Sequence, residues 1–175
     1  MEFTFETATP LLARTPAVLR ALLLELPSPW IEATEGPDTW NPFDVVGHLI
    51  HGERTDWMPR VEHLLTHGAS VAFIPFDRFA MFEASRGRTI AELLDTFASL
   101  RESSLARLAA LGLTSADLPR RGRHPALGTV TLGQLLSSWV VHDLDHIVQI
   151  SRVMARQYTE AVGPWVEYMR ILRPV

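Results

Sequence analysis

The most informative stretch of the sequence, Thr131–Tyr158, reads TLGQLLSSWVVHDLDHIVQISRVMARQY. Thr131 and Gln134, three residues later, form a capping box, in which a hydroxyl and an amide satisfy backbone donors at a helix start. The run that follows contains no proline, so it predicts one continuous helix. Apolar residues cover nearly all of its faces, and a helix of that kind is buried in its own domain.

His142 and His146 lie four residues apart in this stretch, and therefore on the same face of the helix. A buried imidazole costs free energy unless it is hydrogen-bonded or bound to a metal. Two interpretations follow: ligation of a metal ion through the ring nitrogens, or core histidines that bond to the backbone or to Asp145. The zinc-protease motif H-E-x-x-H has Glu where this chain has the shorter Asp143, so a metalloprotease is not expected.

The rest of the chain carries three more helix signals. Thr15-Pro16 and Asn41-Pro42 each place a capping side chain before a proline, and Thr89 with Glu92 forms another capping box. Pro59 predicts a kink in the second helix. The predicted long helices span 16–26, 42–67, 89–111 and 131–158, with a short extra C-terminal helix over 165–172. No long segment alternates with period two, so we predict an all-α fold, a four-helix bundle.

The long connection over 68–88 is unusually aromatic. Its phenylalanines are Phe73, Phe76, Phe79 and Phe82. A long aromatic loop in a compact domain is typical of a packed lid or a wall of a site. Arg78, Arg86 and Arg88 in the same loop could bind an acidic substrate, whereas a surface ion pair or a solvated side chain is the ordinary role of such arginines.

The amino-acid composition excludes several classes of protein and of functional site. A chain of 175 residues that is 47% hydrophobic predicts a single domain over residues 1–175. The net charge of -4 argues against a nucleic-acid partner. The absence of Cys excludes disulfides, a cysteine nucleophile and thiolate ligands. No segment approaches the ~20 apolar residues of a membrane span, and the start MEFTFETATP does not resemble a signal peptide, so we expect no membrane association and a cytoplasmic location.

Two segments resemble the DinB/YfiT-like family of four-helix-bundle proteins: NPFDVVGHL at 41–49, and VHDLDHI at 141–147 together with Gln149. The resemblance extends over nearly the whole chain. It implies that His48 joins His142 and His146 in a three-His site for a divalent metal, nickel or zinc. It also implies a homodimer.

Three neutral imidazoles suit zinc, nickel, copper or iron and leave coordination positions open, as in catalytic rather than structural zinc sites. Carboxylates commonly orient such histidines, and Asp44, Asp143 and Asp145 are the candidates by position in the sequence. Glu53, one turn beyond His48, could be a general base, although a structural role suits its place on the helix better.

The resemblance implies a metal-dependent enzyme that acts on a small molecule. The reaction would be hydrolysis, or a transfer or isomerisation that uses a low-molecular-weight thiol such as bacillithiol or mycothiol. The absence of Cys is compatible with a thiol that arrives as a substrate. One alternative is a non-catalytic metal-binding or stress-associated protein. Another is a structural dimer whose interface would use Trp30, Trp40 or Trp165.

Overall fold

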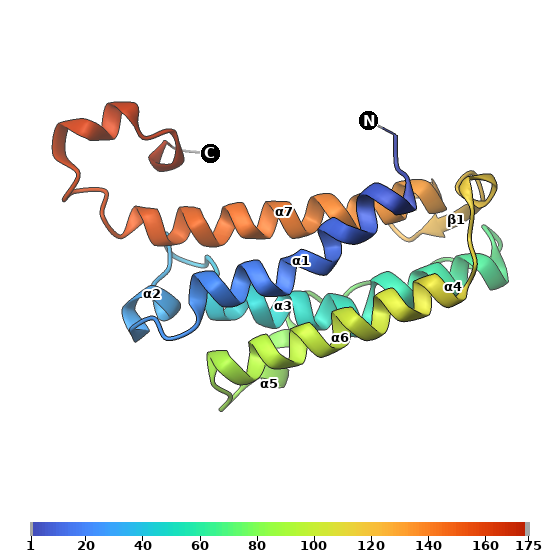
Figure 1. The fold of residues 1–175 in the computed structure, drawn as a ribbon, viewed down its shortest axis with the longest axis horizontal. Coiled ribbons are helices and arrows are strands. Elements are labelled where there is room, and N and C mark those ends of the chain that lie inside the picture. The colour runs from blue at the N-terminus through green and yellow to red at the C-terminus, as the bar shows by residue number, and fades with distance from the viewer. Residues whose placement is uncertain (1, 174–175) are drawn as a thin grey trace.

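Four long helical elements lie side by side and form the body of the protein (Figure 1). The computed structural model describes residues 2–173. The elements are α1 (Phe5–Leu23), α3 (Pro42–Thr55) continued by α4 (Trp57–His67), α6 (Ile90–Ala110) and α7 (Leu132–Arg156). Helix α6 packs against α1 and α3, and α7 closes the bundle against α1, α3 and α4. The predicted four-helix bundle is confirmed.

Shorter elements connect the bundle and close its ends. They are α2 (Ser28–Glu32), α5 (Ala80–Ser85), the 3₁₀ turns η1 (Ser115–Asp117), η2 (Gly163–Tyr168) and η3 (Arg170–Leu172), and the antiparallel strands β1 (Arg121–His124) and β2 (Gly128–Thr131). The expected C-terminal helix is present as η2 and η3, which curl beyond the end of α7 (Figure 1). The β1–β2 hairpin lies between the third and fourth predicted long helices, where no strand was predicted, because four-residue strands are too short to show an alternating pattern.

Helix α7 begins as predicted. The Thr131 hydroxyl accepts from the Gln134 backbone N–H at 3.2 Å, and Gln134 Oε1 accepts from the Thr131 N–H at 2.8 Å. The helix then runs for 25 residues. None of the helices described here combines the length and apolar character needed to cross a bilayer.

The predicted start of the first helix was wrong. Helix α1 begins at Phe5 with Thr4 as its N-cap, and Pro16 lies inside it. Proline has no N–H, so the carbonyl of Leu12 loses its partner within the helix. Arg101 Nη1 donates to that carbonyl at 2.8 Å. A side chain from α6 thus satisfies the group that the proline leaves unpaired, and the helix continues.

The second long element is interrupted near the predicted kink. Helices α3 and α4 meet at Asp56, whose φ of -113° and ψ of -72° depart from helical values. Pro59 cannot donate to the carbonyl of Thr55, which lies four residues earlier. The element therefore bends at Asp56 and continues in the same general direction (Figure 1).

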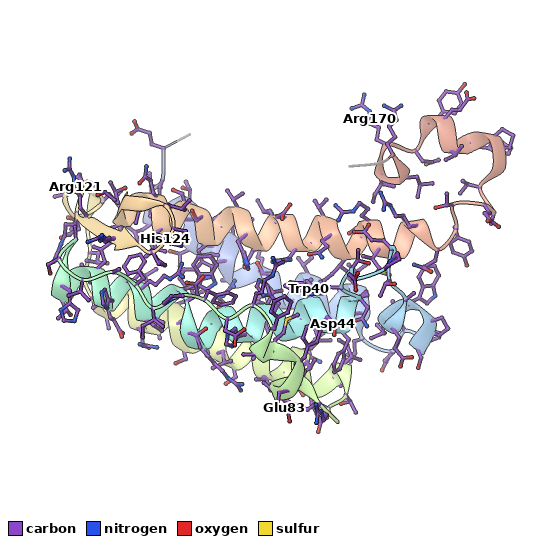
Figure 2. The ribbon with its side chains drawn as sticks, turned by 180° about the vertical axis from the view of Figure 1, so that it is seen from behind. Trp40, Asp44, Glu83, Arg121, His124 and Arg170 are labelled. Atoms are coloured by element: carbon purple, nitrogen blue, oxygen red, sulfur yellow. The ribbon has the colours of Figure 1, made fainter. Side chains whose placement is uncertain are left out.

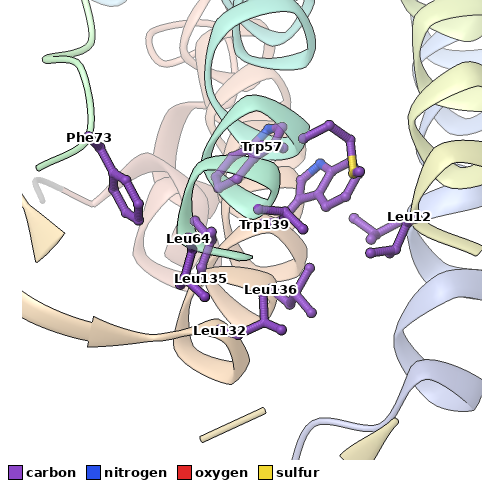
Figure 3. Close-up of a cluster of buried hydrophobic side chains, with 11 residues drawn as sticks. Leu12, Trp57, Leu64, Phe73, Leu132, Leu135, Leu136 and Trp139 are labelled. Carbon is purple, nitrogen blue, oxygen red and sulfur yellow. The ribbon is translucent and has the colours of Figure 1, made fainter. Parts of the chain in front are cut away.

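Two apolar clusters fill the bundle, one toward each end. In the first, Trp57 stacks on Trp139 with ring centroids 5.7 Å apart (Figure 3). The second lies toward the other end of the same helices and includes Leu19, Val46, Phe97 and Ile150. The region of the helices between the clusters carries buried polar side chains, and the candidate site lies at this level.

Candidate metal centre

Three histidines from two helices converge between α3 and α7. His48 Nε2 lies 3.0 Å from His142 Nε2, which lies 3.0 Å from His146 Nε2. His48 and His146 are buried and His142 is partly buried. One nitrogen from each residue lies within 4.8 Å of the others, so the group could hold a metal ion. The structure thus brings together all three histidines predicted as ligands.

Burial keeps these imidazoles neutral, which is the form that binds metal. Loss of water contact is the main cause that lowers the pKa of His48 to about 3, with the charges of His146, His51 and Arg78 adding to it. Burial also lowers the pKa of His142 to about 2, reinforced by the two neighbouring histidines and Arg101. The pKa of His146 is lowered by burial as well, against the opposing effect of its hydrogen bond to Gln149.

Gln149 orients His146. The Nδ1–H of His146 donates to Gln149 Oε1 at 2.7 Å, which leaves the Nε2 lone pair free to bind a metal. Sequence reasoning assigned this orienting role to carboxylates. Asp44 instead caps α3, where its carboxylate accepts from the Asn41 N–H at 3.3 Å. Asp145 is exposed and acts on the pKa of His146 only through its charge.

The nitrogen spacing fits a transition-metal ion. Zinc–imidazole bonds of about 2.0–2.1 Å in a tetrahedral arrangement place two ligand nitrogens ~3.3 Å apart. The two Nε2 separations of 3.0 Å are close to that value. Without an ion, one ring proton on His142 Nε2 can serve only one of its two neighbours. The residues present therefore fit a divalent metal better than a set of mutual hydrogen bonds.

A polar layer beside the site ties the four long elements together. Thr15, Glu53, Arg101 and Asp143, one from each, are all buried. Arg101 donates to both Asp143 oxygens at 2.5 and 3.0 Å and to Glu53 Oε1 at 2.9 Å. Thr15 donates to Asp143 at 2.6 Å, and Trp139 Nε1 donates to Glu53 at 3.2 Å. Glu53 therefore has the structural role that its helix position favours.

Arg101 was missed by sequence reasoning, although α6 carries a signal for it. The buried residues Phe97, Arg101, Ser104 and Leu108 follow one another at helical spacing. An arginine on an apolar stripe must find buried carboxylates, because an unpaired buried charge is very costly. Its pKa is held above the usual value, since the carboxylates of Asp143 and Glu53 outweigh the large opposing effect of burial.

Aromatic side chains wall the three histidines. The ring centroid of Trp40 lies 4.9 Å from that of His48, and Phe76 meets His48 edge-on at 5.5 Å. Trp57 meets His142 edge-on at 5.0 Å. Phe76 belongs to the aromatic loop, so that loop does supply a wall of the site. Trp40, proposed from sequence as an interface residue, contributes to the same wall.

A groove of about 1040 Å³ runs along α7 beside the site. Of the three histidines only His142 lines it, together with Phe3, Gln134 and Val141. Its charged lining residues, Glu2 and Asp145, are both acidic. The groove therefore adjoins the site on the α7 side and carries no positive charge for an anionic ligand.

Comparison with known proteins agrees with this architecture. The structure of YfiT from Bacillus subtilis, described as a probable metal-dependent hydrolase with an unusual four-helix bundle topology, superposes with a TM-score of 0.74. The match covers 89% of this chain and 90% of YfiT at 22% sequence identity, so it shows a shared fold. No curated protein matches the chain. The family model of the DinB superfamily matches residues 11–150, and the chain therefore belongs to the DinB superfamily.

Proposed function

We propose that this protein is a metal-dependent enzyme whose His48, His142 and His146 hold one divalent ion, nickel or zinc. The observation that carries the proposal is the convergence of three neutral imidazoles on one point. Three protein ligands leave at least one position for a further ligand, the pattern of catalytic sites. The YfiT structure supports the same class of function through its fold.

An ion at this position would act as a Lewis acid and lower the pKa of a coordinated water or thiol. The chain would supply the surroundings. Trp40, Phe76 and Trp57 limit the water around the three rings, and Gln149 holds His146 in the ligand tautomer. Glu53 and Asp143, the buried carboxylates of the neighbouring layer, are paired with Arg101 and are poor candidates for a general base.

Two reaction types suit a site without a committed general base: hydrolysis, and transfer or isomerisation with a low-molecular-weight thiol. Both use a nucleophile that ionises when it binds a metal. The aromatic walls support the proposal of a small-molecule substrate, because such sites are lined mainly by apolar and aromatic side chains. Homodimerisation and a cytoplasmic location stay predictions from the sequence.

The test compares metal-depleted protein with protein reloaded with nickel or zinc. Both forms are assayed on small esters and amides, and on electrophiles in the presence and absence of an added thiol. We expect turnover only in the reloaded form and none in His48→Ala, whereas His67→Ala, an exposed histidine outside the site, retains full activity. A requirement for added thiol would assign thiol transfer rather than hydrolysis. Loaded protein that turns over neither class would favour a non-catalytic metal-binding protein.

A further inference from the structure

Arg78 places a positive charge beside the three-histidine site. Its guanidinium carbon lies 5.1 Å from the centre of the Trp40 ring and 5.8 Å from that of Phe79. The Trp40 ring lies 4.9 Å from that of His48. Because both distances are measured to the Trp40 ring, the guanidinium carbon of Arg78 lies no more than about 10 Å from the centre of the His48 ring. Figure 2 shows Trp40 on the face where the chain from α4 to α5 crosses the bundle.

Arg78 forms no ion pair with any carboxylate in residues 2–173. Arg78 is not among the eight arginines that form ion pairs in this part of the chain, which are Arg20, Arg60, Arg86, Arg101, Arg107, Arg120, Arg152 and Arg156. The adjacent carboxylate of Asp77 accepts from the Phe79 backbone N–H at 3.0 Å, which closes a turn. Arg78 is therefore an exposed arginine that lies against two aromatic rings and takes part in no ion pair among the described residues.

Stacking and hydrogen bonding use different parts of a guanidinium. Its face packs on aromatic rings, while its N–H donors point outward in its plane and match the two oxygens of a carboxylate. Contact with Trp40 and Phe79 therefore restricts Arg78 while leaving its donors available. Preorganisation of this kind lowers the entropy cost of binding an anion.

We propose that Arg78, supported by Trp40, is an anion subsite that selects substrates or co-substrates bearing a carboxylate several bonds from the group that meets the metal. The inference rests on the proposed function and adds the charge of the ligand to it. The large groove along α7 cannot serve this purpose, because its charged lining residues are acidic. The carboxylate would bind across the Trp40 ring from the three histidines, and the chain between its two ends would pass over Trp40 or Phe76.

The test measures binding to cobalt-loaded protein, in which the visible absorption of cobalt reports ligands that enter the metal site. The probes are 6-mercaptohexanoate and 6-mercaptohexanol, which share a thiol and a six-carbon chain and differ in the charge at the far end. We expect wild-type protein to bind the acid more tightly than the alcohol. Arg78→Met should weaken acid binding about tenfold, the effect of one charge-assisted hydrogen bond, and leave alcohol binding within about twofold.

Arg86→Met is the matched control. Arg86 is an exposed arginine at the end of α5 that pairs with Glu83 at 2.6 Å, so its replacement removes the same charge without touching Trp40. This variant should retain the wild-type preference for the acid. Arg78→Lys should recover only part of the preference, because an ammonium lacks the planar pair of donors.

The outcomes separate the subsite from the metal function. Equal affinities for acid and alcohol in wild-type protein, or an unchanged preference in Arg78→Met, would overturn the subsite while the cobalt spectrum upholds the metal site. Weakening of both thiols in Arg78→Met would also overturn it, since shape rather than charge would then be the role of Arg78. Failure of wild-type protein to bind cobalt would overturn the proposed function and the subsite with it.

Discussion

At the scale of single residues, the three histidines combine neutrality and burial. Unfolded histidine titrates near pH 6.5, whereas the pKa values of His48 and His142 in the folded chain are lowered to about 3 and about 2. At pH values between the folded and the unfolded pKa, the histidines of the unfolded chain are protonated and those of the folded chain are not. The resulting contribution to stability is present above pH 6.5 and is lost as the pH falls toward 3.

This difference predicts how the metal-free protein responds to acid. Between pH 6 and 4, each of these histidines should lower the free energy of unfolding by up to about 1.4 kcal/mol per pH unit. Urea unfolding of metal-free wild type and of His142→Gln at several pH values measures how the free energy of unfolding changes with pH. The variant should show a slope smaller by about that amount, because the carboxylates titrate alike in both proteins. Parallel slopes would contradict the assigned burial of His142.

Arg101 is the residue on which the polar layer depends. Its replacement by Met leaves the buried carboxylates of Asp143 and Glu53 without their counter-charge. The free energy of unfolding should fall by about 3–5 kcal/mol, as for other broken buried ion pairs. Arg107→Met, on the same helix, removes a half-exposed pair with Glu62 and should cost about 1 kcal/mol or less. Chemical denaturation of both variants tests this, and similar losses would show that the buried network is not special.

At the scale of elements, local signals predicted α6 and α7 well, because the capping boxes at Thr89 and Thr131 act through neighbouring residues alone. The same reasoning was wrong at Thr15-Pro16. There the hydroxyl bonds Asp143 on α7 and the carbonyl of Leu12 bonds Arg101 on α6, so contacts distant in sequence override the local signal. The β1–β2 hairpin depends on packing against α4, which no local pattern reveals.

Gly122 shows how closely that hairpin packs. A Cβ at this position would lie 2.8 Å from Phe73 Cζ and 2.9 Å from Leu64 Cδ1, both in the core. Gly122→Ala should therefore lower the free energy of unfolding by about 1–3 kcal/mol through overpacking. Thr129→Ala, at an exposed position on the partner strand, should cost about 1 kcal/mol or less. Thermal unfolding compares the two, and equal small effects would mean that the hairpin does not pack tightly on α4.

At the scale of the whole molecule, the site joins residues separated by 94 positions in the chain. The i, i+4 spacing placed His142 and His146 on one face, but nothing local connected them to His48, which entered through family resemblance. Arg101 escaped assignment because its partners, Glu53 and Asp143, are set by how the helices pack. Gln149 lies three residues from His146 on the same helix, so its i, i+3 spacing was the local signal that could have assigned its role. The sequence therefore predicted the histidines that meet, and packing between helices determined the buried polar layer beside them.

The most direct test of the metal site is calorimetric titration of metal-free protein with nickel and with zinc. We predict one ion per chain for wild type and His67→Ala. Replacing any one of the three ligands, as in His48→Ala, His142→Ala or His146→Ala, should weaken metal binding at least tenfold. When the free metal concentration is a hundred times the dissociation constant, the free energy of unfolding of wild type should rise by about 2.7 kcal/mol. Absence of binding by wild type, or binding that survives all three substitutions, would contradict a metal site at these histidines.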